Sequence, residues 1–407
     1  MTGPLSHIRV LDLSRVLAGP WCTQNLADLG AEVIKVEKPG TGDDTRAWGP
    51  PYLKDAAGRD TGESAYFLSA NRGKKSVTVD IARPEGQRIV RRLARECDVL
   101  VENYKVGGLV KYGLDYHDIN RENRGLVYCS ITGFGQDGPY AARAGYDFMI
   151  QGMGGLMSLT GERDDRPGGG PQKVGVAVAD LMTGMYATVS ILAALAHRDR
   201  SGLGQHIDLS LLDCQVAMLA NQAMNYLTTG APPPRQGNAH PNIVPYQTFA
   251  TADGHFILAV GNDTQFRRFC ELAGCAALAD DARFSSNRKR VEQREALIPL
   301  LEPVLKARTT HGWIELLEPA GVPCGPINRL DEVFGDAQVR HRGLRVDIPH
   351  PAAGTVPLVA SPMRFSATPL ACERPPPLLG EHTEAVLREL LGASPEEIAR
   401  LREEGVI

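Results

Sequence analysis

Near its start the chain reads Ile8-Arg9-Val10-Leu11-Asp12-Leu13, an apolar run typical of a buried strand. Gly19-Pro20 then begins a helix that is expected to end at Gly30, and Glu32-Val33-Ile34-Lys35-Val36 predicts a second strand. A strand, a helix and a strand within about 30 residues form a βαβ unit, whose right-handed crossover makes the two strands parallel. The opening of the sequence therefore predicts an α/β fold.

The same alternation continues through the first half of the chain. Further strands are expected over residues 76–80, 98–102, 126–131 and 204–210. Pro84 marks a helix start, because the first residue of a helix needs no N–H donor. Two long helices are expected within 174–196 and 211–227. Together these segments predict a parallel sheet covered by helices.

A change of composition follows at Thr229-Gly230-Ala231-Pro232-Pro233-Pro234, a stiff spacer at which we place a domain boundary. Beyond it, strands at 246–250 and 255–260 flank Asp253-Gly254, a strong hairpin signal. Near the end, Ser394-Pro395-Glu396-Glu397 has the residues of a helix start. The second half therefore holds a smaller α+β domain and a helical tail.

Composition excludes several classes of protein. Among 407 residues, 44 Lys and Arg against 48 Asp and Glu give a formal charge of −4, unlike the basic surface of a nucleic-acid binder. The eight cysteines include no Cys-x-x-Cys pair, and the ten histidines show no metal-binding spacing. We also find no apolar run as long as a membrane span. We therefore expect a cytoplasmic protein with no metal site, no nucleic-acid partner and no membrane partner.

The first strand–helix turn, residues 14–20, lacks the Gly-x-Gly-x-x-Gly fingerprint of dinucleotide-binding proteins. The sequence also lacks a phosphate-binding P-loop and the Gly-x-Ser-x-Gly nucleophile elbow of hydrolases. These absences weigh against NAD, FAD, ATP and serine-hydrolase chemistry.

Asp180 stands in an almost uncharged segment, residues 176–185. A lone carboxylate among such residues is costly to bury unless it is hydrogen-bonded or used in chemistry. It could cap a helix over 181–196, or it could be a nucleophile kept ionised by the helix dipole. The residues alone leave both interpretations open.

Basic residues lie near the ends of several expected strands and could together form a rim that binds phosphate groups. They are Arg15, Lys35, Lys38, Arg72, Lys74, Lys75, Lys105 and Lys111. Any one of them alone is better explained as a solvated surface charge.

Several motifs resemble the class III CoA-transferases, the family that includes formyl-CoA transferase and carnitine CoA-transferase. The resemblance runs in one order from about residue 5 to the C-terminus. It is carried by the segments 10–20, 29–37, 71–76, 101–104, 131–135 and 179–184.

The resemblance implies a Rossmann-like large domain built from both termini, a smaller α+β domain, and two chains interlocked as a homodimer. The expected division is 1–228 for the N-terminal part of the large domain, 229–328 for the small domain, and 329–407 for the part that completes the large one. Coenzyme A enters as a substrate, and no permanently bound cofactor is implied.

The resemblance also assigns roles to residues. Asp180 becomes the nucleophile, which would form an aspartyl–acyl anhydride and then an aspartyl-CoA thioester. The glycine-rich stretch 152–170 could cover the site, or could be a plain surface loop. The positions expected to contact CoA are Arg15, Val16, Ala18, Lys38, Arg72, Lys75, Asn103, Tyr104 and Lys111.

Within the family the likeness is closest to members that exchange CoA between succinyl-CoA and glutarate. It rests on segments 42–51, 243–247, 321–328 and 374–380. Arg15 and Arg46 are the two residues proposed to bind the second carboxylate of a dicarboxylic substrate. Malate, itaconate and mesaconate remain alternative acceptors.

Two other functions remain to be weighed. The same fold includes α-methylacyl-CoA racemases, but Tyr146 stands at their histidine position, and a phenol is a poor proton acceptor at neutral pH. The chain could also be an inactive CoA-binding subunit. The presence of Asp180 argues against that alternative.

Overall fold

The computed structural model describes residues 3–370 and 373–407, so Cys372 lies outside the described residues. The chain divides into two compact units. Unit 1 holds the described residues up to Leu156 together with Val174–Met224 and Ala337–Ile407. Unit 2 holds Met157–Lys173 and Asn225–Asp336.

Unit 1 is built on a parallel sheet, as the sequence predicts. Its described strands are β1 (Arg9–Asp12), β2 (Glu32–Glu37), β5 (Lys74–Thr78), β6 (Val99–Glu102), β7 (Val127–Thr132) and β8 (His206–Ser210). They pair in the order β5-β2-β1-β6-β7-β8, and every pair is parallel. The strand order reverses between β1 and β6, because the chain builds outward from β1 on one side and then returns to its other side. In such sheets, ligands bind at the carboxyl ends of the strands beside the reversal.

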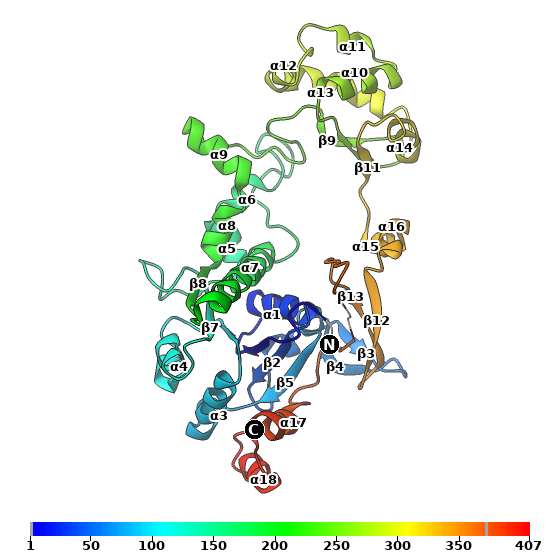
Figure 1. Ribbon diagram of the computed structural model, residues 1–407. Coiled ribbons are helices and arrows are strands. Elements are labelled where there is room, and N and C mark those ends of the chain that lie inside the picture. The colour runs from blue at the N-terminus through cyan, green and yellow to red at the C-terminus, as the bar shows by residue number, and fades with distance from the viewer. Residues whose placement is uncertain (1–2, 371–372) are drawn as a thin grey trace. The chain divides into compact units, whose positions relative to one another are not determined.

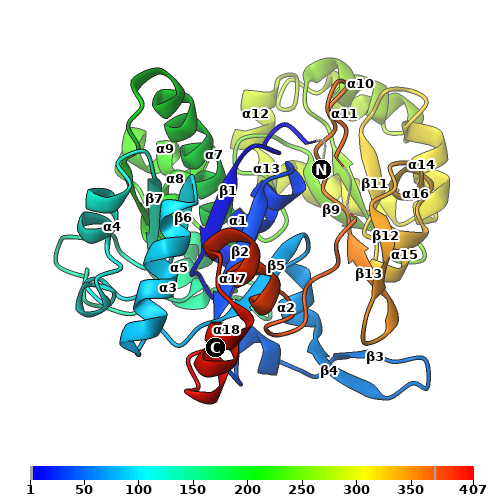
Figure 2. The same cartoon turned by 60° about the horizontal axis from the view of Figure 1, so that its bottom comes forward.

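Helices cover both faces of the sheet, because alternate strand residues point to opposite sides. Leu11 packs in one core and Val10 in the other, and both are fully buried. One face carries α3 (Pro84–Arg95), α4 (Tyr116–Glu122), α17 (Thr383–Leu391) and α18 (Pro395–Glu403). The other carries α1 (Ala18–Asp28), α5 (Asp147–Met153), α7 (Val178–Ser201) and α8 (Leu211–Ala217), and Figure 2 shows α7 and α8 next to β7.

The C-terminal segment packs on the β5 edge of this sheet, where Figure 1 shows α17 beside β5. The His382 N–H donates to the Ser76 carbonyl at 2.9 Å, and the Thr78 N–H donates to Thr383 Oγ1 at 2.9 Å. The expected final helix is confirmed as α18, with Ser394 as its N-cap and Pro395 in its first turn. Residues some 300 positions apart in sequence thus share one core.

Two expectations about helices need correction. The expected helix 211–227 is broken into α8 and α9 (Ala220–Thr229), and Ala220 at the break has a positive φ of 45°. In addition, α7 is long and apolar enough to cross a membrane, contrary to the expectation that the chain has no such run. Buried side chains of α7, such as Ile191, pack in the second core. The core helix of a folded domain can be as long and as apolar as a membrane span.

Shorter elements complete unit 1. They are η1 (Asp44–Ala47), β3 (Tyr52–Lys54), β4 (Asp60–Ser64), α2 (Ala65–Ser69), η2 (Val110–Tyr112), α16 (Ala337–His341), β12 (Arg345–His350) and β13 (Gly354–Val359). The strands β3 and β4 form one antiparallel hairpin, and β12 and β13 form another.

Unit 2 contains an antiparallel sheet of β9 (Tyr246–Ala250), β10 (His255–Ala259) and β11 (Cys324–Pro326), in the order β11-β10-β9. The hairpin predicted around Asp253-Gly254 is confirmed as β9 and β10. Phe256 and Trp313 are central to its core. Its described helices are α10 (Asp263–Leu272), α11 (Ala277–Asp280), α12 (Asn287–Glu292), α13 (Arg294–Leu305), α14 (Thr310–Leu317) and α15 (Leu330–Gly335), and α6 (Leu156–Leu159) lies at the junction with unit 1.

Residues 157–173 belong to unit 2, whereas the expected division gave them to the large domain. Ion pairs hold this segment there. Arg163 pairs with Glu295 at 2.7 Å, and Arg235 pairs with Asp164 and donates to the Glu162 carbonyl. The other boundaries of unit 2 lie at residues 225 and 336, against the expected 229 and 328.

Replacing Leu100 tests the packing of the sheet in unit 1. Leu100 is fully buried in β6, so Leu100→Ala is expected to lower the free energy of unfolding by about 2–5 kcal/mol. The matched control, Leu203→Ala, removes a side chain that is 51% exposed and is expected to cost less than about 0.5 kcal/mol. Urea unfolding measures both, and equal losses would contradict the assigned core.

Candidate active site

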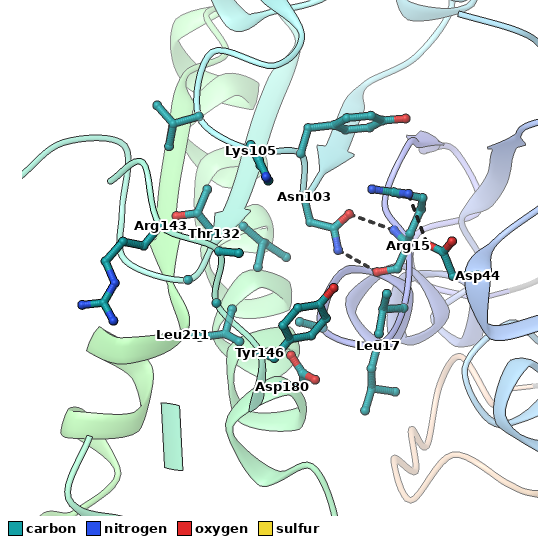
Figure 3. Close-up of a pocket in the computed structure, with 18 of the residues that line it drawn as sticks. Arg15, Leu17, Asp44, Asn103, Lys105, Thr132, Arg143, Tyr146, Asp180 and Leu211 are labelled. Carbon is teal, nitrogen blue, oxygen red and sulfur yellow. Dashed lines mark hydrogen bonds and ion pairs between the residues drawn. The ribbon is translucent and has the colours of Figure 1, made fainter. Parts of the chain in front are cut away.

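A cavity of about 530 Å³ opens at the carboxyl ends of β1, β6 and β7 (Figure 3). Residues 15–18 follow β1, residues 103–106 follow β6, and Gly133 follows β7, and all of them line it. The cavity therefore lies beside the point where the strand order reverses, as expected for a ligand site in an open α/β sheet.

Asp180 lies in this cavity, on the first turn of α7. The helix begins at Val178, so Asp180 is not the N-cap, and the interpretation of Asp180 as a capping residue is wrong. The N–H groups at the start of this helix are bound instead by Asp147. Its Oδ1 accepts from the Ala179 N–H at 2.8 Å and from the Asp180 N–H at 3.4 Å. The Asp180 carboxylate is thus left to face the cavity.

Burial and, to a smaller extent, the negative charge of Asp147 together raise the pKa of Asp180 to about 7. One interpretation of the sequence was that the helix dipole holds this carboxylate ionised. Desolvation and the like charge outweigh the dipole, whose effect is worth about 0.3–1 kcal/mol at an exposed site. The result is a carboxylate that titrates near neutral pH, and such shifts are common at functional sites.

Aromatic side chains line the same cavity as Asp180, and among them the sequence analysis considered only Tyr146, at the histidine position of the racemases. Figure 3 shows the Tyr146 ring next to the Asp180 carboxylate. Trp48 also lines the cavity, and its ring packs edge-on against Tyr66 at 5.0 Å between centroids. Burial raises the pKa of Tyr66 to about 12, with further contributions from Asp180 and Asp147. No spacing in the sequence links these residues to Asp180, because the fold alone brings them together.

A second cavity of about 700 Å³ adjoins the first. Arg15, Asp44, Tyr104 and Lys105 line both, so the two form one elongated site. The residues peculiar to the second cavity include the lysines Lys38 and Lys111, an apolar group, and the ion pair of Lys35 and Asp43. The apolar group is Val79, Ile81 and Tyr112.

The loop after β1 is held by Asn103. Asn103 Oδ1 accepts from the Arg15 N–H at 2.9 Å, and Asn103 Nδ2 donates to the Arg15 carbonyl at 2.6 Å. The Arg15 guanidinium pairs with Asp44 at 3.1 Å and lies 5.3 Å from the centre of the Tyr104 ring. Five predicted site residues, Arg15, Val16, Ala18, Asn103 and Tyr104, are therefore brought together with Asp180.

Val16 in this loop has a φ of 72°, which is unusual for a β-branched residue and costs on the order of 1–3 kcal/mol. Its N–H faces both carboxylate oxygens of Asp43 at 3.3 Å. Although burial alone would raise the pKa of Asp43, Lys35 and Thr45 lower it to about 2. Asp43 is therefore an ionised, fixed acceptor.

Lys35 and Lys74, which we included in the phosphate-binding rim, are buried in ion pairs. Lys35 pairs with Asp43 at 2.9 Å and Lys74 pairs with Asp12 at 3.1 Å, and all four side chains are inaccessible to solvent. Burial lowers the pKa of Lys74 to about 8 against the attraction of Asp12. These two lysines therefore support the floor of the site and do not form its rim.

Arg72 and Lys75 are held away from both cavities. Arg72 donates to both oxygens of Asp28, at 2.8 and 2.5 Å, and Lys75 pairs with Glu32 at 2.6 Å. We expected them to lie with the other CoA contacts. They come before or at the start of β5, so they lie at the amino ends of the strands, opposite the site.

Arg46 is also engaged elsewhere. It donates to both carboxylate oxygens of Glu37 at 2.8 Å and pairs with Glu63 at 3.3 Å. Its guanidinium stacks on the Phe67 ring, and its side chain is 9% exposed. It is therefore poorly placed to bind a substrate carboxylate.

Two other expectations concern the surroundings of the site. In the described part of the chain, no group of three or more His, Cys, Asp and Glu side chains is arranged to hold a metal ion. The glycine-rich stretch divides at residue 156 between the units, and the described lining of the first cavity includes none of it.

Comparison with known proteins gives a consistent result. A family model described as CoA-transferase family III matches residues 5–383. The succinate–glutarate CoA-transferase of Agrobacterium fabrum is 54% identical over 387 residues, which cover 95% of this chain and 96% of that protein. The succinyl-CoA:glutarate CoA-transferase of Mus musculus is 46% identical over 404 residues, covering 99% of this chain and 90% of that one. Among solved structures, a CaiB/BaiF family protein from Brucella suis superimposes with a TM-score of 0.84 at 52% identity, covering 96% of this chain and all of that one.

The raised pKa of Asp180 predicts a stability effect. The Asp180 carboxyl group titrates near 7 in the folded protein and near 3.9 in the unfolded chain. The free energy of unfolding therefore falls as the pH rises from about 4 to about 7, because the carboxyl group ionises first in the unfolded chain. Asp180→Asn is therefore expected to raise the Tm at pH 8 by several degrees and by much less at pH 4.5. Scanning calorimetry at both pH values checks this, and a Tm gain independent of pH would contradict the assigned electrostatics.

Proposed function

The chain belongs to CoA-transferase family III, and from this premise we propose that it moves coenzyme A from succinyl-CoA to glutarate. The observation that carries the proposal is a partly buried carboxylate with a raised pKa, Asp180, in a cavity at the strand-order reversal. The names of two relatives that match nearly the whole chain support this pair of substrates.

Asp180 is the proposed nucleophile. Its carboxylate oxygen attacks the thioester carbonyl of succinyl-CoA, which gives an aspartyl–succinyl anhydride and releases the CoA thiolate. The thiolate attacks the Asp180 carbonyl carbon, which gives an aspartyl-CoA thioester and releases succinate. Glutarate then attacks this thioester, which gives an aspartyl–glutaryl anhydride and releases the thiolate a second time. The thiolate attacks the glutaryl carbonyl, which gives glutaryl-CoA and frees the Asp180 carboxylate. Each step exchanges one activated acyl bond for another, so no ATP is consumed.

The surroundings of Asp180 suit this chemistry. A carboxylate with a pKa near 7 is a stronger nucleophile than an exposed aspartate, because burial has removed its water shell. Keeping the thiolate bound between steps makes its attack effectively intramolecular, which can contribute about 7–11 kcal/mol. The Trp48 and Tyr146 rings line the same cavity and supply apolar surface for the acyl chain.

Coenzyme A is proposed to occupy the two adjoining cavities. Its phosphates would lie near Lys38 and Lys111, with the apolar group of the second cavity against the adenine. The pantetheine arm would pass Arg15, Tyr104 and Lys105, which line both cavities, and reach Asp180. Val16, Ala18 and Asn103 shape the wall along this path, whereas Arg72 and Lys75 are not included.

We also propose that the protein acts as a homodimer in the cytoplasm. Exposed apolar side chains on one face of α7, including Met185, Tyr186 and Val189, support a contact with another surface. The scattered cysteines support a reducing compartment. Light scattering on the purified protein would measure the mass of the assembly.

The central experiment incubates the protein with succinyl-CoA and a panel of acids, and identifies the CoA esters by mass spectrometry. We expect glutaryl-CoA from the wild type and at least about a 10³-fold loss of rate in Asp180→Ala. Asp199→Ala is the matched control, because it removes an exposed carboxylate from the same helix that lines neither cavity, and it is expected to retain most activity. Exchange by Asp180→Ala at the wild-type rate would exclude the nucleophile, and the absence of exchange with any donor would overturn the proposed function.

Arg15 is proposed to bind the second carboxylate of the diacid, because its guanidinium is half-exposed within the cavity. Loss of a charged hydrogen bond of about 1.5–3 kcal/mol predicts that Arg15→Ala lowers kcat/KM for glutarate by about 10–100-fold. The rate with a monocarboxylate such as butyrate should change much less. Arg143→Ala is the control, since Arg143 lines the same cavity but lies over the Phe134 and Tyr140 rings. Equal losses for both acids would contradict this role.

A further inference from the structure

The bend at residues 14–16 is tied at every step by side chains from elsewhere in unit 1. Lys35 Nζ donates to the Ser14 carbonyl at 2.8 Å. Asn103 binds both the N–H and the carbonyl of Arg15. Asp43 receives the N–H of Val16. These three side chains come from β2, from the segment after β6 and from the start of η1, so the bend is fixed from three directions.

Val16 needs this support. Among the non-glycine residues that the structure describes, only Val16 and Ala220 have a positive φ. A branched Cβ disfavours that conformation, and residues held in it persist only where the surroundings over-determine them. Released from its contacts, Val16 would be expected to return to a negative φ. The chain would then turn differently just before α1, and both Arg15 and Ala18 would move in the cavity wall.

Lys35 and Asp43 bind the two ends of the bend: Lys35 binds the Ser14 carbonyl, and Asp43 binds the Val16 N–H. Their side chains are completely buried and lie 2.9 Å apart. Thr45 fixes the same carboxylate through its N–H at 3.0 Å and its hydroxyl at 2.8 Å. An ion pair in such a setting cannot reorient without breaking several hydrogen bonds, so it is a rigid anchor.

We propose that the buried Lys35–Asp43 pair positions the CoA-binding loop by holding Val16 in the left-handed conformation. Asp43 and Lys35 lie at the second cavity but outside the lining of the cavity that holds Asp180, and their side chains are inaccessible to solvent. We therefore assign them as positioning residues. The inference rests on the proposed function, because it assigns the loop 14–18 to acyl-CoA binding. It explains why a costly backbone conformation occurs at the entrance to α1, beside the nucleophile.

The test begins with Asp43→Asn, which keeps the shape of the side chain and removes its charge. We expect KM for succinyl-CoA to rise by about tenfold or more, while kcat at saturation changes by less than about threefold, because the chemistry at Asp180 is untouched. Asp28→Asn is the matched control. It breaks a comparable buried pair with Arg72 in the same unit, and it contacts neither the loop nor either cavity.

The decisive measurement is a double-mutant cycle with Val16→Gly. Glycine adopts a φ near 72° without strain, so it does not need Asp43 to hold it there. The KM effect of Asp43→Asn is expected to fall from about tenfold to less than about threefold in the Val16→Gly background. A merely structural role for Asp43, or a direct contact of Asp43 with CoA in the second cavity, would give the same loss in both backgrounds, and that result would overturn the inference.

Two further experiments allow the test to be made even where Asp43→Asn does not fold or where the enzyme shows no activity. Should Asp43→Asn fail to fold, Thr45→Val removes one hydrogen bond to Asp43 and should raise KM in the same direction, with the same relief by Val16→Gly. Calorimetric titration with free CoA repeats the cycle as changes in Kd. If the wild type binds CoA but transfers none, the proposed function fails while the cycle in Kd still decides the inference. If the wild type binds no CoA, both are overturned.

Discussion

Two buried ion pairs, Asp12–Lys74 and Lys35–Asp43, lie beneath the carboxyl ends of the first strands. Removing one partner from a buried pair leaves an uncompensated charge, which typically costs about 3–5 kcal/mol. Asp12 also accepts from the Ser14 N–H and from Thr23 on α1, so the pairs fix both the strand and the helix that follows. The loop of the active site depends on this layer of two ion pairs, because Lys35 binds the Ser14 carbonyl and Asp43 binds the Val16 N–H.

The layer separates two electrostatic environments. Below the loop, each buried charge has an opposite charge at hydrogen-bond distance, and the pKa of Asp43 is lowered to about 2. In the cavity, the burial of Asp180 and the like charge of Asp147 raise its pKa to about 7. The same residue type therefore serves as a fixed acceptor in one place and as a titratable carboxylate in the other. The difference follows from the neighbours that each carboxylate has.

The local sequence was sufficient to predict the six strands of the parallel sheet and the hairpin of β9 and β10. The strands β1, β2, β6 and β7 are short and mostly apolar, so they were predicted close to their observed bounds. The break between α8 and α9 was missed because residues 211–227 are continuously helix-compatible and Ala220 carries no local signal for a positive φ. The assignment of residues 157–173 to unit 2 was missed for a similar reason, since the partner of Arg163 is 132 residues away in the chain.

For the site, the sequence by itself determined that a lone carboxylate, Asp180, stands in an apolar segment, and that Arg15 and Asn103 follow strands of a parallel sheet. Such features are local, because chain order fixes which residues follow a strand. Only the tertiary structure decided which cations face the cavity and which are buried in ion pairs, and it removed Arg46, Arg72 and Lys75 from the expected contacts. Charge pairing depends on distances across the fold, and these are set when strands distant in sequence meet in one sheet.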